Sequence, residues 1–504
     1  MRTTLMAFGV AFTLAGCAPA RDAVTPAPGS IDQGAAWTPS ARAQFYSQDQ
    51  GSQLMPAAWL MALKGADGQP FMADKLSRYG YLPNREDPTT VLPVGFSVAG
   101  PPGARMVGMT CAACHTREIA VDNKAYRIDG GPAFADFQSF LADLDKAVGT
   151  LTSDPVAFDT FAVSVLGNQP ASADKVALRE QLDRWYRRYH NIISRSLPQE
   201  PWGPARLDAV AMIFNRLTGL DLGPPPDFII PENIRVADAP VRYPFLWNSA
   251  RQDKTQWPGF ADNGNDVLAL ARNLGQVFGV FATFHPVREP KVLLLGVNYV
   301  SNNSANFDGL FKLETLLKQI GPPRYPFPID KALAAQGAAI FARDAGQGGC
   351  QSCHGIRPGA FRGLEETWAT PIQDVGTDSR EVNLLARTAK SGVLEGRMAP
   401  LGGTLKAEET AVQLLGAAVF GSILQAPFAA DLQRQGKLAM VAPRDPEAYR
   451  RRRRRRRPQA CRALIRPRNK RRRWPRHPVL PTNHASCRAS GRLRRICTTA
   501  QYQH

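Results

Sequence analysis

Cys111-Ala112-Ala113-Cys114-His115 has the spacing C-x-x-C-H, and the rest of the chain can be interpreted from this stretch. Two thiols at this spacing can each bond to one vinyl group of a haem, and the histidine directly after them can bind the iron. The spacing recurs at Cys350-Gln351-Ser352-Cys353-His354. The sequence therefore predicts two covalently attached c-type haems. Their attachment points would be Cys111, Cys114, Cys350 and Cys353, and their iron ligands His115 and His354.

Each motif has a simpler interpretation as a disulfide pair or a zinc site. A zinc site with two cysteines and two histidines would need a second histidine at a ligand spacing of its own, and each motif has one histidine. Two occurrences of the full pentapeptide pattern in one exported chain favour haem over both alternatives.

Residues 1–17 have the features of a bacterial export signal. Arg2 provides a short positive region, residues 5–15 are apolar but too few to span a membrane, and the sequence Leu14-Ala15-Gly16-Cys17 resembles a lipobox. We therefore predict a lipid on Cys17, with an ordinary signal peptide as the alternative. Ala18 after the cysteine favours the outer membrane. The predicted location is the periplasm or cell envelope, which agrees with haem attachment outside the bacterial cytoplasm.

The net charge of +19 is concentrated at one end of the chain. Residues 450–504 hold 20 of the 62 Lys and Arg residues and no Asp or Glu, which leaves 42 basic residues against 43 acidic ones elsewhere. A near-neutral body gives no electrostatic reason to expect a nucleic-acid partner. The tail, residues 446–504, cannot form a core because it includes eight consecutive arginines. It is either a basic interaction arm or a frameshifted end, and the lack of acidic residues from residue 450 onward favours the second interpretation.

A length of 504 residues predicts two or three domains. Residues 18–40, rich in Ala, Pro, Gly and Asp, are expected to be a flexible tether. Gly321-Pro322-Pro323 marks a linker, so we predict an N-terminal haem domain over 41–323 and a C-terminal haem domain over 324–445. Apolar periodicity predicts helices over 134–148, 175–193, 207–217, 271–281, 306–320, 329–343 and 406–419.

The C-terminal segment resembles a small cytochrome c domain in its layout. A helix precedes the second motif, and a loop with the pattern M-x-P-x-G-G at 398–403 and a last helix follow it. The predicted fold class is therefore mainly α, with two cytochrome c-like haem domains, long loops and an enlarged N-terminal domain.

Over residues 50–445 the chain resembles the di-haem cytochromes of the bacterial cytochrome c peroxidase superfamily, and most of all the branch that contains the di-haem rubber oxygenases. The features that carry this resemblance are the two C-x-x-C-H motifs, the aromatic stretches 243–247 and 256–257, Gly321-Pro322-Pro323, and Cys353-His354-Gly355 with 370–371 and 375–378 behind it.

The resemblance implies that one haem stores an electron while the other reacts with peroxide or oxygen. In the oxygenase branch the reactive haem would be the one on His115. Met398 is the candidate sixth ligand of the second haem, although a surface or core methionine is the commoner case. The oxygenase branch uses a distal histidine near the C-terminus instead, and the histidines of this tail lack a recognisable motif. Bound calcium is implied by the resemblance alone.

No convincing sixth ligand for the first haem stands out in the sequence. His190 and His285 are expected to be ordinary packed or surface histidines. Four residues could line the open side of this haem: Trp247, Arg272, Gln276 and Phe278.

The sequence thus predicts an exported di-haem oxidoreductase of the peroxidase or oxygenase kind. Its expected partners are a small oxidant, either peroxide or oxygen, an electron donor or organic substrate, and a membrane reached through a lipid. The alternative is an electron-transfer cytochrome without chemistry of its own, which would serve a partner dehydrogenase or oxidase.

Overall fold

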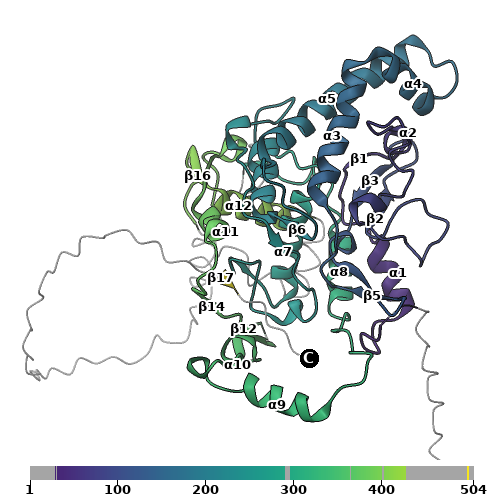
Figure 1. The fold of residues 1–504 in the computed structure, drawn as a ribbon. Coiled ribbons are helices and arrows are strands. Elements are labelled where there is room, and N and C mark those ends of the chain that lie inside the picture. The colour runs from purple at the N-terminus through teal and green to yellow at the C-terminus, as the bar shows by residue number, and fades with distance from the viewer. Residues whose placement is uncertain are drawn as a thin grey trace, which may run out of the picture.

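The computed structural model describes residues 29, 31–289, 296–363, 365–399, 402–426 and 497–498. Helices joined by long loops and short sheets make up the fold (Figure 1). The helices are α1 Pro39–Ser47, α2 Ala57–Ala62, α3 Phe137–Ser153, α4 Pro155–Leu166, α5 Ser172–Ser196, α6 Ala209–Arg216, α7 Asp266–Gly279, α8 Phe307–Leu317, α9 Lys331–Phe341, α10 Gln351–His354, α11 Arg380–Asn383 and α12 Ala411–Gln425. Each range predicted to be helical overlaps one of these helices, with shifted ends.

The strands are short and pair mostly as local antiparallel hairpins. A three-stranded sheet has the order β1-β3-β2, and the longest pairing joins β4 to β5. The strands are β1 Met55–Pro56, β2 Phe96–Ala99, β3 Met106–Met109, β4 Thr116–Val121, β5 Lys124–Asp129, β6 Arg206–Leu207, β7 Val241–Arg242, β8 Lys254–Thr255, β9 Ala261–Asp262, β10 Val287–Arg288, β11 Val297–Asn298, β12 Pro358–Arg362, β13 Glu365–Trp368, β14 Ile372–Gln373, β15 Thr388–Lys390, β16 Glu408–Thr410 and β17 Cys497–Thr498.

Side-chain caps explain where two of the main helices begin. The Asp136 carboxylate accepts a hydrogen bond from the amide of Ser139, so α3 begins three residues later than periodicity indicated. Asn265 accepts from the amide of Leu268, which starts α7 five residues before the predicted range. Capping therefore moved the helix ends in both directions.

The first hydrophobic core lies among α2, α3, α4, α5 and the three-stranded sheet, which stand together in Figure 1. Phe140, Leu141, Leu144 and Leu182 are fully buried in it. Its buried residues extend along the sequence from Leu54 to Phe281. This core surrounds one side of the first C-x-x-C-H motif, since Ala113 belongs to it and Cys114 packs against it.

The expectation that residues 18–40 form a flexible tether is wrong for the part from 31 onward. Ile31 and Trp37 are buried, and α1 already begins at residue 39. The Gln33 side-chain amide donates to the carbonyls of Asp129 (2.7 Å) and Gly321 (2.9 Å). The composition of this segment favoured a tether. The buried side chains of Ile31 and Trp37 and the hydrogen bonds of Gln33 instead hold it against the rest of the protein.

The predicted domain boundary after residue 323 does not separate two hydrophobic cores. The second core joins α6 and α7 to α12, and its buried residues extend from Val210 to Ile423. Figure 1 shows α12 beside α7, far from α9 and α10. The last amphipathic helix therefore completes a core that the preceding residues begin, because its apolar face is buried there rather than against α9.

Residues 324–375, which include the second motif, contribute little to either core. Neither α9 nor α10 has a buried residue. Several of the most exposed large apolar side chains of the described chain lie here, among them Tyr325, Ile329, Leu333, Ile340 and Phe361. In Figure 1 this segment forms the lower part of the molecule, apart from the two large cores.

Within the described residues no helix is both long enough and apolar enough to cross a membrane. The predicted signal peptide and Cys17 lie outside the described residues, as does almost all of the basic tail. Cys497–Thr498 of that tail are described as β17, which pairs antiparallel with β14.

Glu381 of α11 has a buried carboxyl group. Burial raises the pKa of Glu381 to about 8, and the negative charge of Asp208 adds to this effect. Between its ordinary pKa of 4.5 and this value, the folded protein holds a proton that the unfolded chain releases. The free energy of unfolding should therefore fall by about 1.4 kcal/mol per pH unit as the pH rises through this window.

We predict that Glu381→Gln removes this pH dependence. The variant should match the wild type near pH 4.5 and be more stable near pH 8, because glutamine carries no charge to bury. Urea unfolding at both pH values measures the difference. Glu408→Gln, at an exposed position, is the control. An unchanged slope in Glu381→Gln would show that Glu381 is ionised in the folded protein at neutral pH.

Candidate functional site

The first C-x-x-C-H motif lies on the wall of a cavity of about 210 Å³. A short 3-10 turn, Cys111–Ala113, lies between β3 and β4; Cys111 begins it and Cys114 directly follows it. The Thr110 side chain starts this turn by accepting a hydrogen bond from the amide of Ala112. The turn places Cys111, Cys114 and His115 on the same cavity wall.

The His115 ring is oriented by a backbone carbonyl. Its Nδ1 lies 2.9 Å from the carbonyl oxygen of Pro244, so Nδ1 carries the proton and donates it to that oxygen. Burial lowers the pKa of His115 to about 4, against a smaller opposing effect of the Pro244 bond, so the ring is neutral at physiological pH. Nε2 is then left as a lone-pair donor. A neutral histidine held through its other nitrogen is the usual form of a metal ligand.

The two thiols of the motif are free and half-buried in the cavity wall. Burial raises the pKa of Cys111 to about 11 and that of Cys114 to about 12. Both therefore remain protonated thiols rather than reactive thiolates. These thiols differ from the low-pKa pair of a redox C-x-x-C motif.

Most of the remaining cavity wall is apolar or aromatic. It includes Phe137, Met212, Ile213, Tyr243, Phe245, Leu246, Trp247 and Trp257. The ring of Tyr243 lies edge-on to that of His115, with 6.3 Å between their centroids. Such a wall suits a large flat apolar group with a few polar contacts.

A buried ion pair stands beside Cys111. Arg272 of α7 pairs with Glu314 of α8, and the side chains of both are 5% exposed. The guanidinium also donates to Asn263 (2.6 Å) and Asn273 (3.2 Å). Each side-chain nitrogen of Arg272 thus makes a hydrogen bond, which leaves two of its five N–H groups for other contacts.

Three of the four residues predicted for the open side of the first haem line this cavity: Trp247, Arg272 and Gln276. Phe278 does not, because it is fully buried in the second core and stacks on Phe284 with 4.4 Å between centroids. Gln276 lies one helical turn after Arg272. Among the described residues its side-chain amide has no hydrogen-bond partner, so it can still donate to a ligand in the cavity.

The two other histidines considered have ordinary roles. His190 is half-exposed, and its Nδ1 pairs with the carboxylate of Asp145 at 2.9 Å. His285 stacks flat on Phe228, with 4.1 Å between centroids, away from the cavity wall. Neither histidine is placed to bind an iron held by His115.

The second motif lies in a different environment. Cys350 is exposed and Cys353 half-buried, both as free thiols, and none of the motif lines the cavity. Met398 is 36% exposed, and its neighbours Leu394 and Ala399 pack in the second core. That Met398 is the sixth ligand of a haem on His354 stays a prediction.

Calcium also stays a prediction. In the part of the chain that the structure describes, no group of three or more His, Cys, Asp or Glu residues is placed to hold a metal ion.

Sequence reasoning missed the Pro244 carbonyl and the buried hydroxyl of Thr255. Thr255 lines the cavity, and its Oγ1 has no hydrogen-bond partner among the described residues. The stretch 243–247 had been singled out for its aromatic residues, but a backbone acceptor leaves no sequence signal. Only the proximity of a proline-containing loop to a ligand histidine could have suggested it.

No protein-family model matches the chain. The chain is 30% identical over 409 residues to the uncharacterized protein y4iJ of Sinorhizobium fredii (strain NBRC 101917 / NGR234). This match covers 69% of the chain and 64% of y4iJ. The chain therefore spans less than two thirds of the length of this relative.

Proposed function

We propose that this chain is an exported di-haem c-type cytochrome that acts as an oxidoreductase, with peroxide or oxygen reacting at the haem on His115. The observation that carries the proposal is the hydrogen bond between His115 Nδ1 and Pro244, which leaves Nε2 free beside two thiols on one cavity wall. A disulfide or a redox thiol pair would not require an oriented neutral histidine at the same place.

The residues of the first site fit a covalently held haem. Cys111 and Cys114 would bond to the two vinyl groups, and Nε2 of His115 would bind the iron. The aromatic and aliphatic wall would cover the ring and keep water from it. The orphan hydroxyl of Thr255 could satisfy a haem carboxylate, since a buried polar atom without a partner is costly.

The haem, when bound, supplies an iron that can exchange electrons and bind a small oxidant. The contribution of the chain is to hold His115 neutral and fixed, and to provide a hydrogen-bond donor on the cavity wall. Gln276 is such a donor, because it lines the cavity and its side-chain amide has no hydrogen-bond partner among the described residues. It would donate a hydrogen bond to a small oxidant in the cavity.

The second site suits electron exchange. Cys350 is exposed on a segment whose large apolar side chains, such as Leu333 and Ile340, are also exposed. A haem attached there would cover part of this surface and remain near the outside of the molecule. This exposure also favours the second candidate function, a cytochrome that only passes electrons to or from a partner. A lipid on Cys17 would hold either protein in the cell envelope.

The reduced-plus-CO minus reduced optical spectrum separates the two functions. It should be measured on a chain matured with haem that carries Cys350→Ala and Cys353→Ala, so that only the first haem contributes. A CO signal is expected, because His115 is the one histidine among the described residues that lines this cavity. A fully loaded first haem without a CO signal would contradict the oxidoreductase and favour electron transfer.

A further inference from the structure

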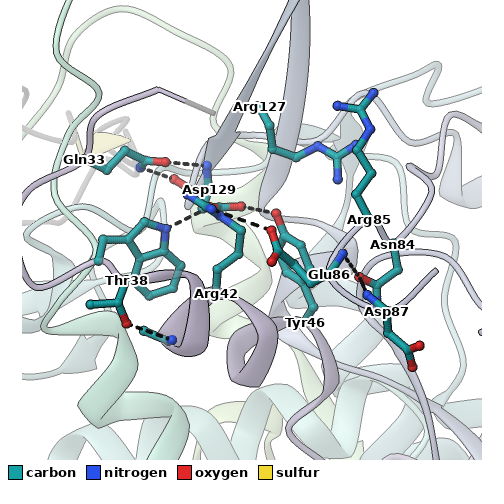
Figure 2. A network of polar contacts seen from close by, with 12 residues as sticks. Gln33, Thr38, Arg42, Tyr46, Asn84, Arg85, Glu86, Asp87, Arg127 and Asp129 are labelled. Carbon is teal, nitrogen blue, oxygen red and sulfur yellow. Dashed lines mark hydrogen bonds and ion pairs between the residues drawn. The ribbon is translucent and has the colours of Figure 1, made fainter. Parts of the chain in front are cut away.

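A buried polar network is built on the carboxylate of Asp129, the last residue of β5. Its side chain is fully buried and accepts three hydrogen bonds from the N-terminal segment (Figure 2). The donors are Trp37 Nε1 at 2.8 Å, Arg42 Nε at 2.7 Å and the Tyr46 hydroxyl at 2.5 Å. Two of these residues, Arg42 and Tyr46, lie on α1.

The backbone of Asp129 is held equally firmly. Its amide donates to Gln33 Oε1 at 2.8 Å, and its carbonyl accepts from Gln33 Nε2 at 2.7 Å. The same carbonyl accepts from the indole nitrogen of Trp247 at 2.8 Å. The main chain at residue 129 is therefore fixed by the N-terminal segment on one side and by residue 247 on the other.

The next residue connects this network to the first site. The amide of Gly130 donates to the carbonyl of His115 at 2.8 Å, and the amide of Leu246 donates to the carbonyl of Gly130 at 2.8 Å. Residues 129 and 130 thus hold both the backbone of His115 and the loop 244–247. The first residue of that loop is Pro244, whose carbonyl orients the His115 ring.

We infer that Asp129 is a positioning residue for His115 and that the N-terminal segment, residues 31–47, sets the iron ligand through it. This inference rests on the proposed function. Every link is a hydrogen bond of 2.5 to 2.9 Å, and the chain of contacts is short: Tyr46 to Asp129, Asp129 to Trp247, and loop 244–247 to His115. Loss of a link should loosen the loop and weaken the Nδ1–H bond to Pro244.

A weaker Nδ1–H bond makes the imidazole a poorer electron donor to iron. The iron(II) state is then favoured, so the midpoint potential of the first haem should rise and the iron–histidine vibration should move to lower frequency. A residue that supported only the fold would move neither quantity once the protein is folded and loaded.

Tyr46→Phe is the most informative variant, because Tyr46 touches Asp129 and does not line the cavity. Trp247→Phe removes the indole donor directly, although this ring also lines the cavity. Asp129→Asn is less suitable, since it would leave Arg42 buried without its carboxylate. Trp202→Phe is the matched control: its buried indole donates to the carbonyl of Ala237 at 2.7 Å, away from this network.

The experiment compares these variants by redox titration and resonance Raman spectroscopy in holoprotein that also carries Cys350→Ala and Cys353→Ala. Tyr46→Phe and Trp247→Phe should shift the potential upward and the iron–histidine vibration downward, while Trp202→Phe should match its parent. If Tyr46→Phe matches the control in both quantities, the positioning role is overturned while the proposed function stands. If the parent carries no haem on Cys111 and Cys114, the proposed function fails, and this role fails with it.

Discussion

His115→Gly should keep the haem bound to Cys111 and Cys114 but lose more than about 100-fold in turnover with peroxide or oxygen. The iron would lose its predicted histidine ligand. Imidazole added to the solution should restore part of the turnover, because it can occupy the space of the removed ring. Steady-state turnover of holoprotein with and without imidazole measures both effects.

The control for this variant is His190→Gly, which removes a half-exposed histidine paired with Asp145. It should react as the wild type does. Unchanged turnover in His115→Gly would show that the chemistry takes place at the second haem or does not involve the iron of the first.

Glu314→Leu should destabilise the folded protein by about 3–5 kcal/mol, since it leaves the guanidinium of Arg272 buried without its counter-charge. The pair joins α7 to α8, and Arg272 lines the same cavity as Cys111, so the destabilisation should affect the wall of the first site. The midpoint of urea unfolding at fixed haem content measures it.

A double variant separates the cost of the orphaned charge from the cost of lost packing. Arg272→Met together with Glu314→Leu should recover most of the lost stability, because two apolar side chains of similar size need no counter-charge. If the single variant unfolds at the same urea concentration as the wild type, water must reach Arg272 and the ion pair is not buried in solution.

The helices were the most predictable part of this fold. Apolar periodicity located α3, α5, α7 and α12, because each buries one face in a core. Their ends were less predictable, since a single cap such as Asp136 or Asn265 decides them. The hairpins were not predicted at all. Many of their strands have two residues and carry no period to detect, although β4 and β5 have six residues each.

The arrangement of the cores could not be predicted from the sequence. A proline-rich linker at 321–323 indicated a domain boundary, yet α12 packs on α7 across it. Local turn residues report only where the chain bends, and the partner of an apolar face depends on the whole fold. For the same reason residues 31–40 had the composition of a tether and lie against the body.

The candidate site was predictable where covalent chemistry fixes the spacing. The motif located Cys111, Cys114 and His115, and all three line one cavity. The atoms that orient His115 could not be predicted from the sequence. The hydrogen bonds of the Pro244 carbonyl and of Asp129 join residues about 80 to 130 positions apart. Long-range contacts of this kind leave no pattern in one sequence.

Covalent haem attachment at the first motif can be tested by mass spectrometry. The protein is expressed with a c-type haem maturation system and digested, and the mass of the peptide containing Cys111 and Cys114 is measured. We predict that this peptide carries one haem, joined through both sulfurs. A peptide with two unmodified cysteines, from protein whose second motif is loaded, would contradict it.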